Sequence, residues 1–157
     1  MQLSMFYGAR ATKPTRVDSD EFWEDIRTGK WEKEITELRK LLRSKGKAVF
    51  VTSTAARRPG SGGLSYYAAT KGALNSWVIS EGRRQAKKGI GLCAVAPGFF
   101  ESPMTDEMAP GLVEAVTKAI PFGRFGSCDE IATFIDSLLD QSNWTLAGSI
   151  YECAGGA

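Results

Sequence analysis

Two short apolar runs in the sequence show no alternation of polar and apolar residues. "AVFVT" spans Ala48 to Thr52, and "IGLCAVAPG" follows downstream and is halted by Pro97-Gly98. Strands covered on both faces of a parallel sheet show continuous apolar runs, whereas half-exposed strands alternate. The two runs therefore predict a parallel sheet with both faces buried.

Segments with helical signals lie between and beyond these runs. A helix is expected from about Tyr66 to Lys88, because basic residues fill its last turn and Gly89 follows. Upstream, Asp18 and Glu21 form a capping-box pattern, and helical spacing runs from Trp31 onward. "DEIATFIDSLL" predicts a further amphipathic helix, whose inner stripe consists of Ile131, Phe134, Ile135, Leu138 and Leu139.

Two further strands are expected, "LSMFYG" from Leu3 to Gly8 and "GSIYEC" near the end of the chain. The resulting alternation of strands and helices predicts an α/β fold, a doubly wound sheet with right-handed crossovers, and a single domain over residues 1–157. Ligands of such sheets bind beyond the carboxyl ends of the strands. Ser53 and Pro97-Gly98 follow two predicted strands directly, so the site is expected there.

Composition excludes several classes of function. The 157 residues carry a net charge of +2, which gives no indication of nucleic acid or of a membrane surface. The basic stretch "EGRRQAKKG" is interpreted as a solvated helix face. No run reaches the ~18 apolar residues of a membrane span, and three dispersed cysteines fit a reducing cytoplasm. The absence of histidine excludes Ser-His-Asp chemistry and His-ligated metal sites within one chain.

Tyr67 and Lys71 stand four residues apart, which places a phenol and an ammonium on one helix face. A nearby ammonium favours the phenolate and lowers the phenol pKa from its ordinary ~10. A strand-end hydroxyl such as that of Ser53 can hold a carbonyl or alcohol oxygen within reach of the phenol. Each residue also has a structural alternative: a packed ring beneath a solvated charge, or a hydroxyl that satisfies the backbone.

Five stretches in order resemble the short-chain dehydrogenase/reductase family: "GKAVFVTSTAA", "YYAATKGAL", "VAPGFFESPM", "IPFGRFGSCDEIA" and "AGSIYECAGG". The resemblance implies that Tyr67 is the general acid/base, that Lys71 lowers the pKa of Tyr67 and holds the nicotinamide ribose, and that Ser53 orients the substrate oxygen. The cofactor implied is NAD or NADP. The implied cofactor-binding residues are Tyr67, Lys71, Pro97, Gly98 and Ser102.

The sequence departs from the family pattern in its first part. It contains no Gly-x-Gly-x-x-Gly turn, and "PGSGGLS" is interpreted as an active-site loop. Alignment of Trp23 with the family's usual aromatic places Gly8 at the end of the family's Asn-Asn-Ala-Gly motif. We therefore expect a partial Rossmann-like sheet of about four strands that lacks the first βαβαβ half. In this register Lys30 replaces a catalytic asparagine and offers no acceptor for its proton relay.

The departures leave two functions open. The first is an NAD(P)-dependent oxidoreductase acting on a small-molecule carbonyl/alcohol pair, with similarity toward 3-oxoacyl-thioester reductases. The alternative is a non-catalytic truncated relative that serves as a dimerisation or binding module. In either case residues 3–8 would form an open sheet edge, so we expect a homo-oligomer or a complementing N-terminal partner.

Other residues have simpler interpretations. Arg57-Arg58 is predicted to be a solvated basic pair rather than a phosphate contact, and Cys93 a small apolar filler. Trp31 and Trp77 are expected in a core or an interface. Met104 and Met108 follow the Pro-Gly turn, where the family has a mobile lid, and both substrate contact and lid packing stay open.

Overall fold

The computed structural model describes residues 3–8, 16–17, 46–58 and 65–157. A five-stranded sheet has the order β2-β1-β3-β4-β5. Its strands are β1 (Leu3–Gly8), β2 (Arg16–Val17), β3 (Lys47–Val51), β4 (Gly91–Pro97) and β5 (Ala147–Cys153). The helices are α3 (Ser65–Ala86), α4 (Pro103–Asp106), α5 (Pro110–Ala119) and α6 (Cys128–Asp140), with 3-10 turns η1 (Thr54–Ala56) and η2 (Asn143–Leu146).

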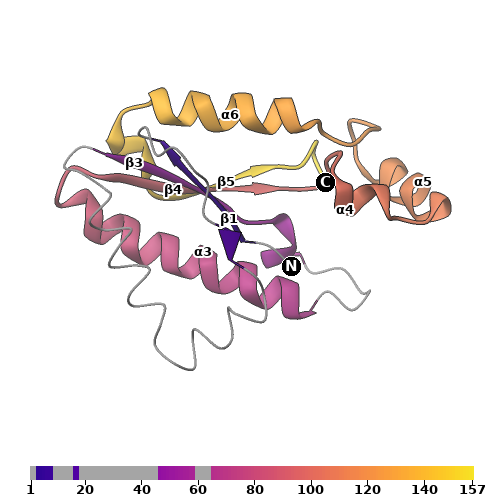
Figure 1. Ribbon diagram of the computed structural model, residues 1–157, viewed down its shortest axis with the longest axis horizontal. Helices are drawn as coiled ribbons and strands as arrows, with labels where there is room; N and C mark the ends of the chain where they lie inside the picture. Colours follow the sequence, from indigo (N-terminus) through magenta and orange to yellow (C-terminus); the bar gives the residue numbers. More distant parts are fainter. Residues whose placement is uncertain (1–2, 9–15, 18–45, 59–64) are drawn as a thin grey trace.

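Strands β3, β4 and β5 are parallel, with α3 on one face of the sheet and α6 on the other (Figure 1). Alternate residues of β3 and β4 point to opposite faces and form two buried clusters. The cluster beneath α3 contains Ala48, Phe50, Leu74, Val78, Leu92 and Ala94. The cluster beneath α6 contains Val49, Cys93, Val95, Ile135, Leu138 and Leu146. The predicted α/β arrangement is confirmed, as are the inner stripe of α6 and the role of Cys93 as an apolar filler.

Strand β1 has the predicted bounds, but its direction and its pairing with neighbouring strands differ from the prediction. It pairs antiparallel with β3, and its other side pairs antiparallel with β2 at Leu3↔Val17 and Ser4↔Arg16. The expectation that residues 3–8 run parallel to the rest is therefore wrong, because antiparallel neighbours need no right-handed crossover. The expectation of a bare edge is wrong at Leu3 and Ser4, where β2 pairs with the outer side of β1.

Two glycines bring the backbones of α3 and β5 into direct contact. A Cβ placed on Gly82 would lie 2.4 Å from the backbone nitrogen of Gly148. Gly148 has a φ of +84°, and a Cβ there would lie 2.8 Å from the carbonyl oxygen of Ile79. Only glycine fits at either position without displacing backbone. Phe50 and Trp77 add an edge-on ring contact with 5.2 Å between centroids, and the half-buried Trp77 packs against the cluster beneath α3.

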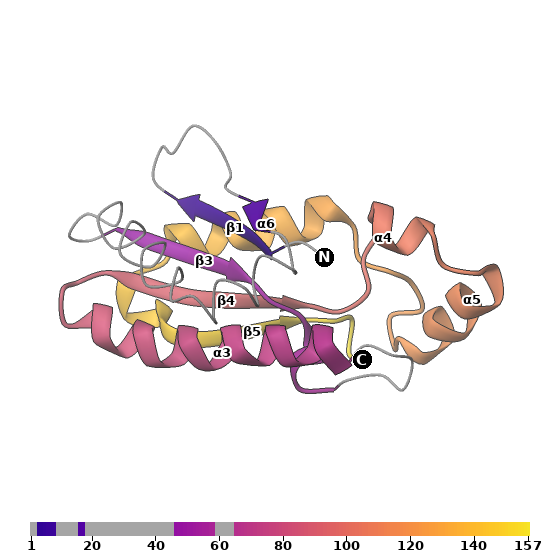
Figure 2. The ribbon, with the colours of Figure 1, turned by 60° about the horizontal axis from the view of Figure 1, so that its bottom comes forward.

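Helices α4 and α5 lie beyond the carboxyl ends of β4 and β5 (Figure 2). The sequence patterns did not predict these two helices. Pro103 and Pro110 stand in the first turns of α4 and α5, where a missing N–H costs nothing. Met104 lies on α4 and Met108 just after it. Within the described ranges, no helix is long and apolar enough to cross a membrane.

Some predictions fall outside the described residues and stay predictions. They are the capping box at Asp18 and Glu21, the helix from Trp31, the substitution at Lys30, and most of the loop "PGSGGLS".

Candidate functional site

Lys71 is buried at the start of α3, close to the carboxyl end of β3. Its side chain is 5% exposed, and its Nζ donates a hydrogen bond of 3.1 Å to the Val51 carbonyl. The same nitrogen lies 5.7 Å from the centre of the Tyr67 ring. Burial lowers the pKa of Lys71 from its ordinary 10.5 to about 8. The helix thus brings an ammonium with a reduced proton affinity beside a phenol ring.

The segment that carries Ser53 crosses this same edge of the sheet. Ser53 precedes η1, and its Oγ accepts a hydrogen bond of 3.1 Å from the Ala55 N–H. Thr54 Oγ1 donates a 3.3 Å hydrogen bond to the Pro97 carbonyl. A Cβ on Gly72 would lie 3.7 Å from the Ala56 carbonyl oxygen, so α3 passes close to η1. The ends of β3 and β4 and the start of α3 therefore meet around Ser53.

Arg57 and Arg58 share one carboxylate. Their guanidinium groups lie 2.8 Å from the two oxygens of Glu152, on β5. The arginine side chains are 70% and 53% exposed, as expected for a solvated pair, but no sequence pattern indicated their partner. The two ion pairs tie the residues after η1 to the carboxyl end of β5.

The Pro-Gly turn after β4 packs against the end of β5. The Gly98 N–H donates a 2.9 Å hydrogen bond to the Cys153 carbonyl, and a Cβ on Gly98 would lie 3.0 Å from Ala154. Ser102 stands farther along, at the N-terminus of α4. Its backbone N–H donates to Thr105 Oγ1 over 2.8 Å, and the two hydroxyl oxygens lie 3.3 Å apart. Ser102 is therefore engaged in capping α4.

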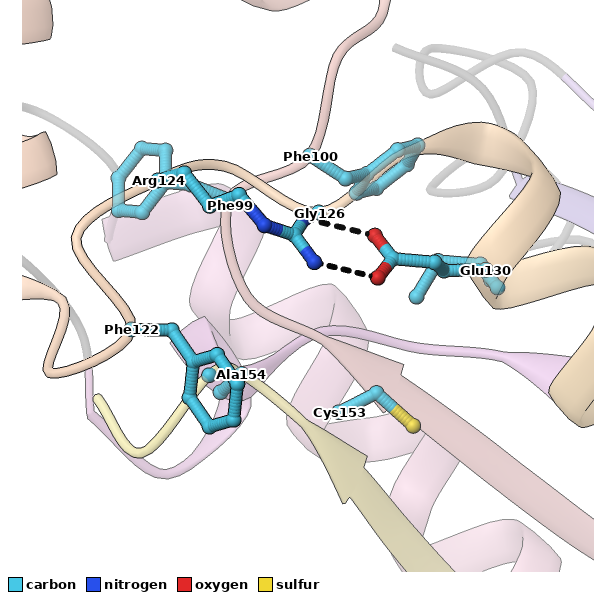
Figure 3. A pocket seen from close by; sticks show the side chains of 10 residues that line it. Phe99, Phe100, Phe122, Arg124, Gly126, Glu130, Cys153 and Ala154 are labelled. Atoms are coloured by element: carbon cyan, nitrogen blue, oxygen red, sulfur yellow. Dashed lines mark hydrogen bonds and ion pairs between the residues drawn. The ribbon is translucent and has the colours of Figure 1, made fainter.

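A pocket of about 220 Å³ opens beside the Pro-Gly turn (Figure 3). Aromatic rings form much of its wall, and the Arg124–Glu130 ion pair stands at one side. The Arg124 guanidinium and the Ser127 backbone N–H hold the pKa of Glu130 at about 2. Sequence reasoning missed this pocket, although the adjacent aromatics in "PGFF" were a signal. Its lining includes Phe99, Phe100, Phe122, Ile131, Cys153 and Ala154.

The described residues contain no cluster of Cys, Asp and Glu side chains arranged to hold a metal ion. The chemistry available at the edge of the sheet is that of a phenol, a buried ammonium, a serine hydroxyl and backbone groups. These residues can bind an oxygen and move a proton to or from it.

Residues 33–157 match a protein family described as Enoyl-(Acyl carrier protein) reductase. The chain is 33% identical over 116 residues to a 3-oxoacyl-[acyl-carrier-protein] reductase of Staphylococcus aureus, a match that covers 74% of this chain and 47% of that protein. It is 38% identical over 97 residues to an acetoacetyl-CoA reductase of Synechocystis, covering 62% of this chain and 40% of that protein. The chain thus spans about half the length of the curated relatives that it matches.

The chain is also similar to solved structures of short-chain dehydrogenases/reductases. A short-chain dehydrogenase/reductase variant from Serratia marcescens superposes with a TM-score of 0.67 at 27% identity, covering 73% of this chain and 46% of that one. A short-chain glucose/ribitol dehydrogenase from Brucella melitensis gives a TM-score of 0.66 at 31% identity, with the same coverage. The matched residues, the relatives and the fold agree: the chain belongs to the short-chain dehydrogenase/reductase family.

Proposed function

We propose that this chain carries the proton-transfer half of an NAD(P)-dependent oxidoreductase that interconverts a carbonyl and an alcohol. The observation that carries the proposal is the burial of Lys71 at the carboxyl end of β3, beneath the Tyr67 ring and next to the segment that bears Ser53. A buried ammonium without a carboxylate partner is costly, and such groups concentrate at functional sites.

Each residue has a distinct role in the proposal. The Ser53 hydroxyl holds the substrate oxygen by a hydrogen bond. The Tyr67 hydroxyl gives its proton to that oxygen during reduction and takes it back during oxidation. The Lys71 ammonium, fixed by the Val51 carbonyl, supplies positive charge that stabilises the phenolate left behind.

The residues fit the nicotinamide–ribose half of a dinucleotide. Lys71 uses one of its three N–H groups on Val51, so others can donate to ribose hydroxyls. Pro97 and Gly98 lie at the end of β4, where Gly98 packs directly on Ala154, and Ser102 follows at α4. When bound, the nicotinamide would supply the hydride. The sequence contains no glycine-rich phosphate turn, so the pyrophosphate half needs other contacts.

The substrate class we favour is a 3-oxoacyl thioester. Two of the relatives are named as reductases of such compounds, and the aromatic pocket that starts just after Gly98 suits an apolar group. The second candidate, a non-catalytic dimerisation or binding module, is favoured by the absence of a glycine-rich phosphate turn from the 157 residues. In both cases we propose that the chain associates with a second copy or with a complementing partner.

Cofactor binding separates the two candidates. The purified chain is titrated with NADH and with NADPH while nicotinamide fluorescence is followed. Lys71→Ala should weaken saturable binding about tenfold, equivalent to about 1.4 kcal/mol, and Lys118→Ala on the exposed face of α5 should leave it unchanged. Tyr67→Phe should weaken cofactor binding less than Lys71→Ala does and should abolish reduction of an acetoacetyl thioester. Absence of binding at millimolar cofactor would reject the enzymatic proposal for the isolated chain.

A further inference from the structure

Two neighbouring arginines, Arg57 and Arg58, converge on one carboxylate. Arg57 Nη1 donates a 2.8 Å hydrogen bond to Oε1 of Glu152, and Arg58 Nη2 donates one of 2.8 Å to Oε2 of the same side chain. Two solvated arginines without a common partner would repel each other. Here each guanidinium holds one oxygen of a single anion, so the pair is arranged to bind an anion with two oxygens.

The segment that carries the arginines crosses the carboxyl ends of three parallel strands. It leaves β3 at Ser53 and contacts the end of β4, where Thr54 Oγ1 donates to the Pro97 carbonyl. The arginines then reach the end of β5. Ser53 and Arg57 cap the two ends of η1, which at ~2 Å per residue separates them by roughly 8 Å. A substrate whose oxygen is held by Ser53 can therefore extend an arm to the arginine pair.

The surroundings of the pair carry an excess of positive charge. Two guanidinium groups face one carboxylate, and within the described ranges neither arginine forms an ion pair with a second carboxylate. The first turn of α3 contains no acidic residue that would offset the partial positive charge of the helix N-terminus. The buried ammonium of Lys71 lies at the same edge of the sheet. These charges favour the approach of an anionic substrate over a neutral one.

The two ion pairs with Glu152 can be exchanged at little cost. Both arginines are more than half exposed, and the Glu152 side chain is 27% exposed, so water and salt screen the contact. A phosphodiester resembles a carboxylate because it presents two unesterified oxygens that share one negative charge. Arginine forms charge-assisted hydrogen bonds with both kinds of group. A phosphate can therefore take the position of the Glu152 carboxylate.

We propose that Arg57 and Arg58 bind a phosphate group on the carrier arm of the substrate, in exchange for Glu152. The inference rests on the proposed function and narrows its substrate class to thioesters whose carrier arm bears a phosphate. Coenzyme A and the phosphopantetheine arm of an acyl carrier protein share this chemistry, and two relatives are named for thioesters of these two carriers. Glu152 competes with the phosphate and holds the arginines in place when no substrate is bound.

Binding of the carrier arm can be measured without nicotinamide and without turnover. The full chain is titrated by calorimetry with 4′-phosphopantetheine, with coenzyme A and with pantetheine, which lacks the phosphate. At low ionic strength the phosphorylated compounds should bind at least about tenfold more tightly than pantetheine, and added salt should reduce the difference. Tight binding of coenzyme A alone would identify coenzyme A thioesters as the substrates. Equal affinity for pantetheine and both phosphorylated compounds would overturn the proposal.

Variants of the three residues test the exchange itself. Arg57→Ala combined with Arg58→Ala should abolish the preference for the phosphorylated compounds. Glu152→Gln removes the competing charge and should tighten their binding about threefold, whereas loss of a merely structural contact would weaken the binding of all three compounds. The control combines Arg83→Ala with Lys87→Ala, which removes two exposed positive charges near the C-terminal end of α3 and should leave each affinity unchanged. Weaker phosphopantetheine binding in Glu152→Gln would contradict the exchange.

A parallel titration with NADH separates this proposal from the proposed function, because NADH also carries phosphate groups. NADH binding should be unchanged in the double arginine variant, which would assign the pair to the substrate. Weakened NADH binding with an unchanged preference for phosphopantetheine would overturn the inference and leave the proposed function standing. Absence of NADH binding in every variant would reject the enzymatic proposal, and the preference for a phosphorylated arm would still be measurable.

Discussion

Helices α3 and α5 both border the carboxyl edge of the sheet, but only α3 is part of the core. Leu74 and Val78 of α3 are 2% and 0% exposed, and the helix backbone touches β5 at Gly82. Helix α5 has no buried residue, and its Leu112 is 52% exposed. The residues proposed for chemistry therefore stand on a helix that packing holds in place, whereas the segment after the Pro-Gly turn can shift at little cost.

The largest expected difference between the two helices concerns their leucines. Leu74→Ala should lower the free energy of unfolding by about 3 kcal/mol, because it leaves a cavity beneath α3. Leu112→Ala should change it by less than about 0.5 kcal/mol. Urea unfolding followed by far-UV circular dichroism measures both. Similar losses in the two variants would show that α5 is covered in solution.

Glycine-to-alanine substitutions should also affect the two helices differently. A Cβ at Gly82 would collide with the Gly148 backbone, so Gly82→Ala should cost about 1–3 kcal/mol through overpacking. A Cβ at Gly111 on α5 would meet nothing within 4 Å. Gly111→Ala should stabilise the protein by about 0.5–1 kcal/mol, because alanine is the better helix former. The melting temperature should fall in Gly82→Ala and rise in Gly111→Ala. A higher melting temperature in Gly82→Ala would disprove the close packing of α3 against β5.

The buried ammonium on α3 should give the stability a pH dependence that α5 lacks. The pKa of Lys71 is about 8 in the folded chain against an ordinary 10.5, so between these values the unfolded chain binds more protons. The free energy of unfolding should therefore rise as the pH increases from about 8 to about 10.5. Below about pH 8 the ammonium is charged in both states, so the full free-energy cost of burying it is present.

This dependence is isolated by comparing variants at two pH values. Between about pH 7.5 and about pH 9, the wild-type chain should gain about 1 kcal/mol relative to Lys71→Met. Lys118→Met, which removes an exposed lysine of α5, should behave as the wild type. Parallel curves for the wild type and Lys71→Met would mean that the ammonium is not buried in solution.

The smallest expected effect concerns the ion pairs that hold the residues after η1. Glu152→Gln removes the charge shared by Arg57 and Arg58 and should cost between a few tenths and about 1 kcal/mol, because the arginines are exposed. The loss should shrink at high salt, where the charges are screened. Urea unfolding at low and high ionic strength tests this, and a salt-independent loss would point to packing instead of charge.

Much of the central fold could be predicted because its signals are local. The continuous apolar runs of β3 and β4 must be covered on both faces of the sheet. The apolar face of α6 must likewise be buried, regardless of which segment covers it. Helix α3 ends near the predicted residue, since Gly89 adopts a φ of +72° there. The motif order around Ser53, Tyr67 and Lys71 indicated the family, which the comparisons with known proteins confirm.

The features of the fold and the site that were not predicted depend on contacts between residues distant in the sequence. The direction of β1 follows from its pairing with both β2 and β3, and a six-residue apolar run has no preference between parallel and antiparallel neighbours. Glu152 as the partner of Arg57 and Arg58 lies more than 90 residues away. Local sequence patterns are enough to identify the buried segments and the side chains that are available for chemistry. The burial of Lys71 and the aromatic pocket could not be predicted, because both depend on which distant segments pack around a residue.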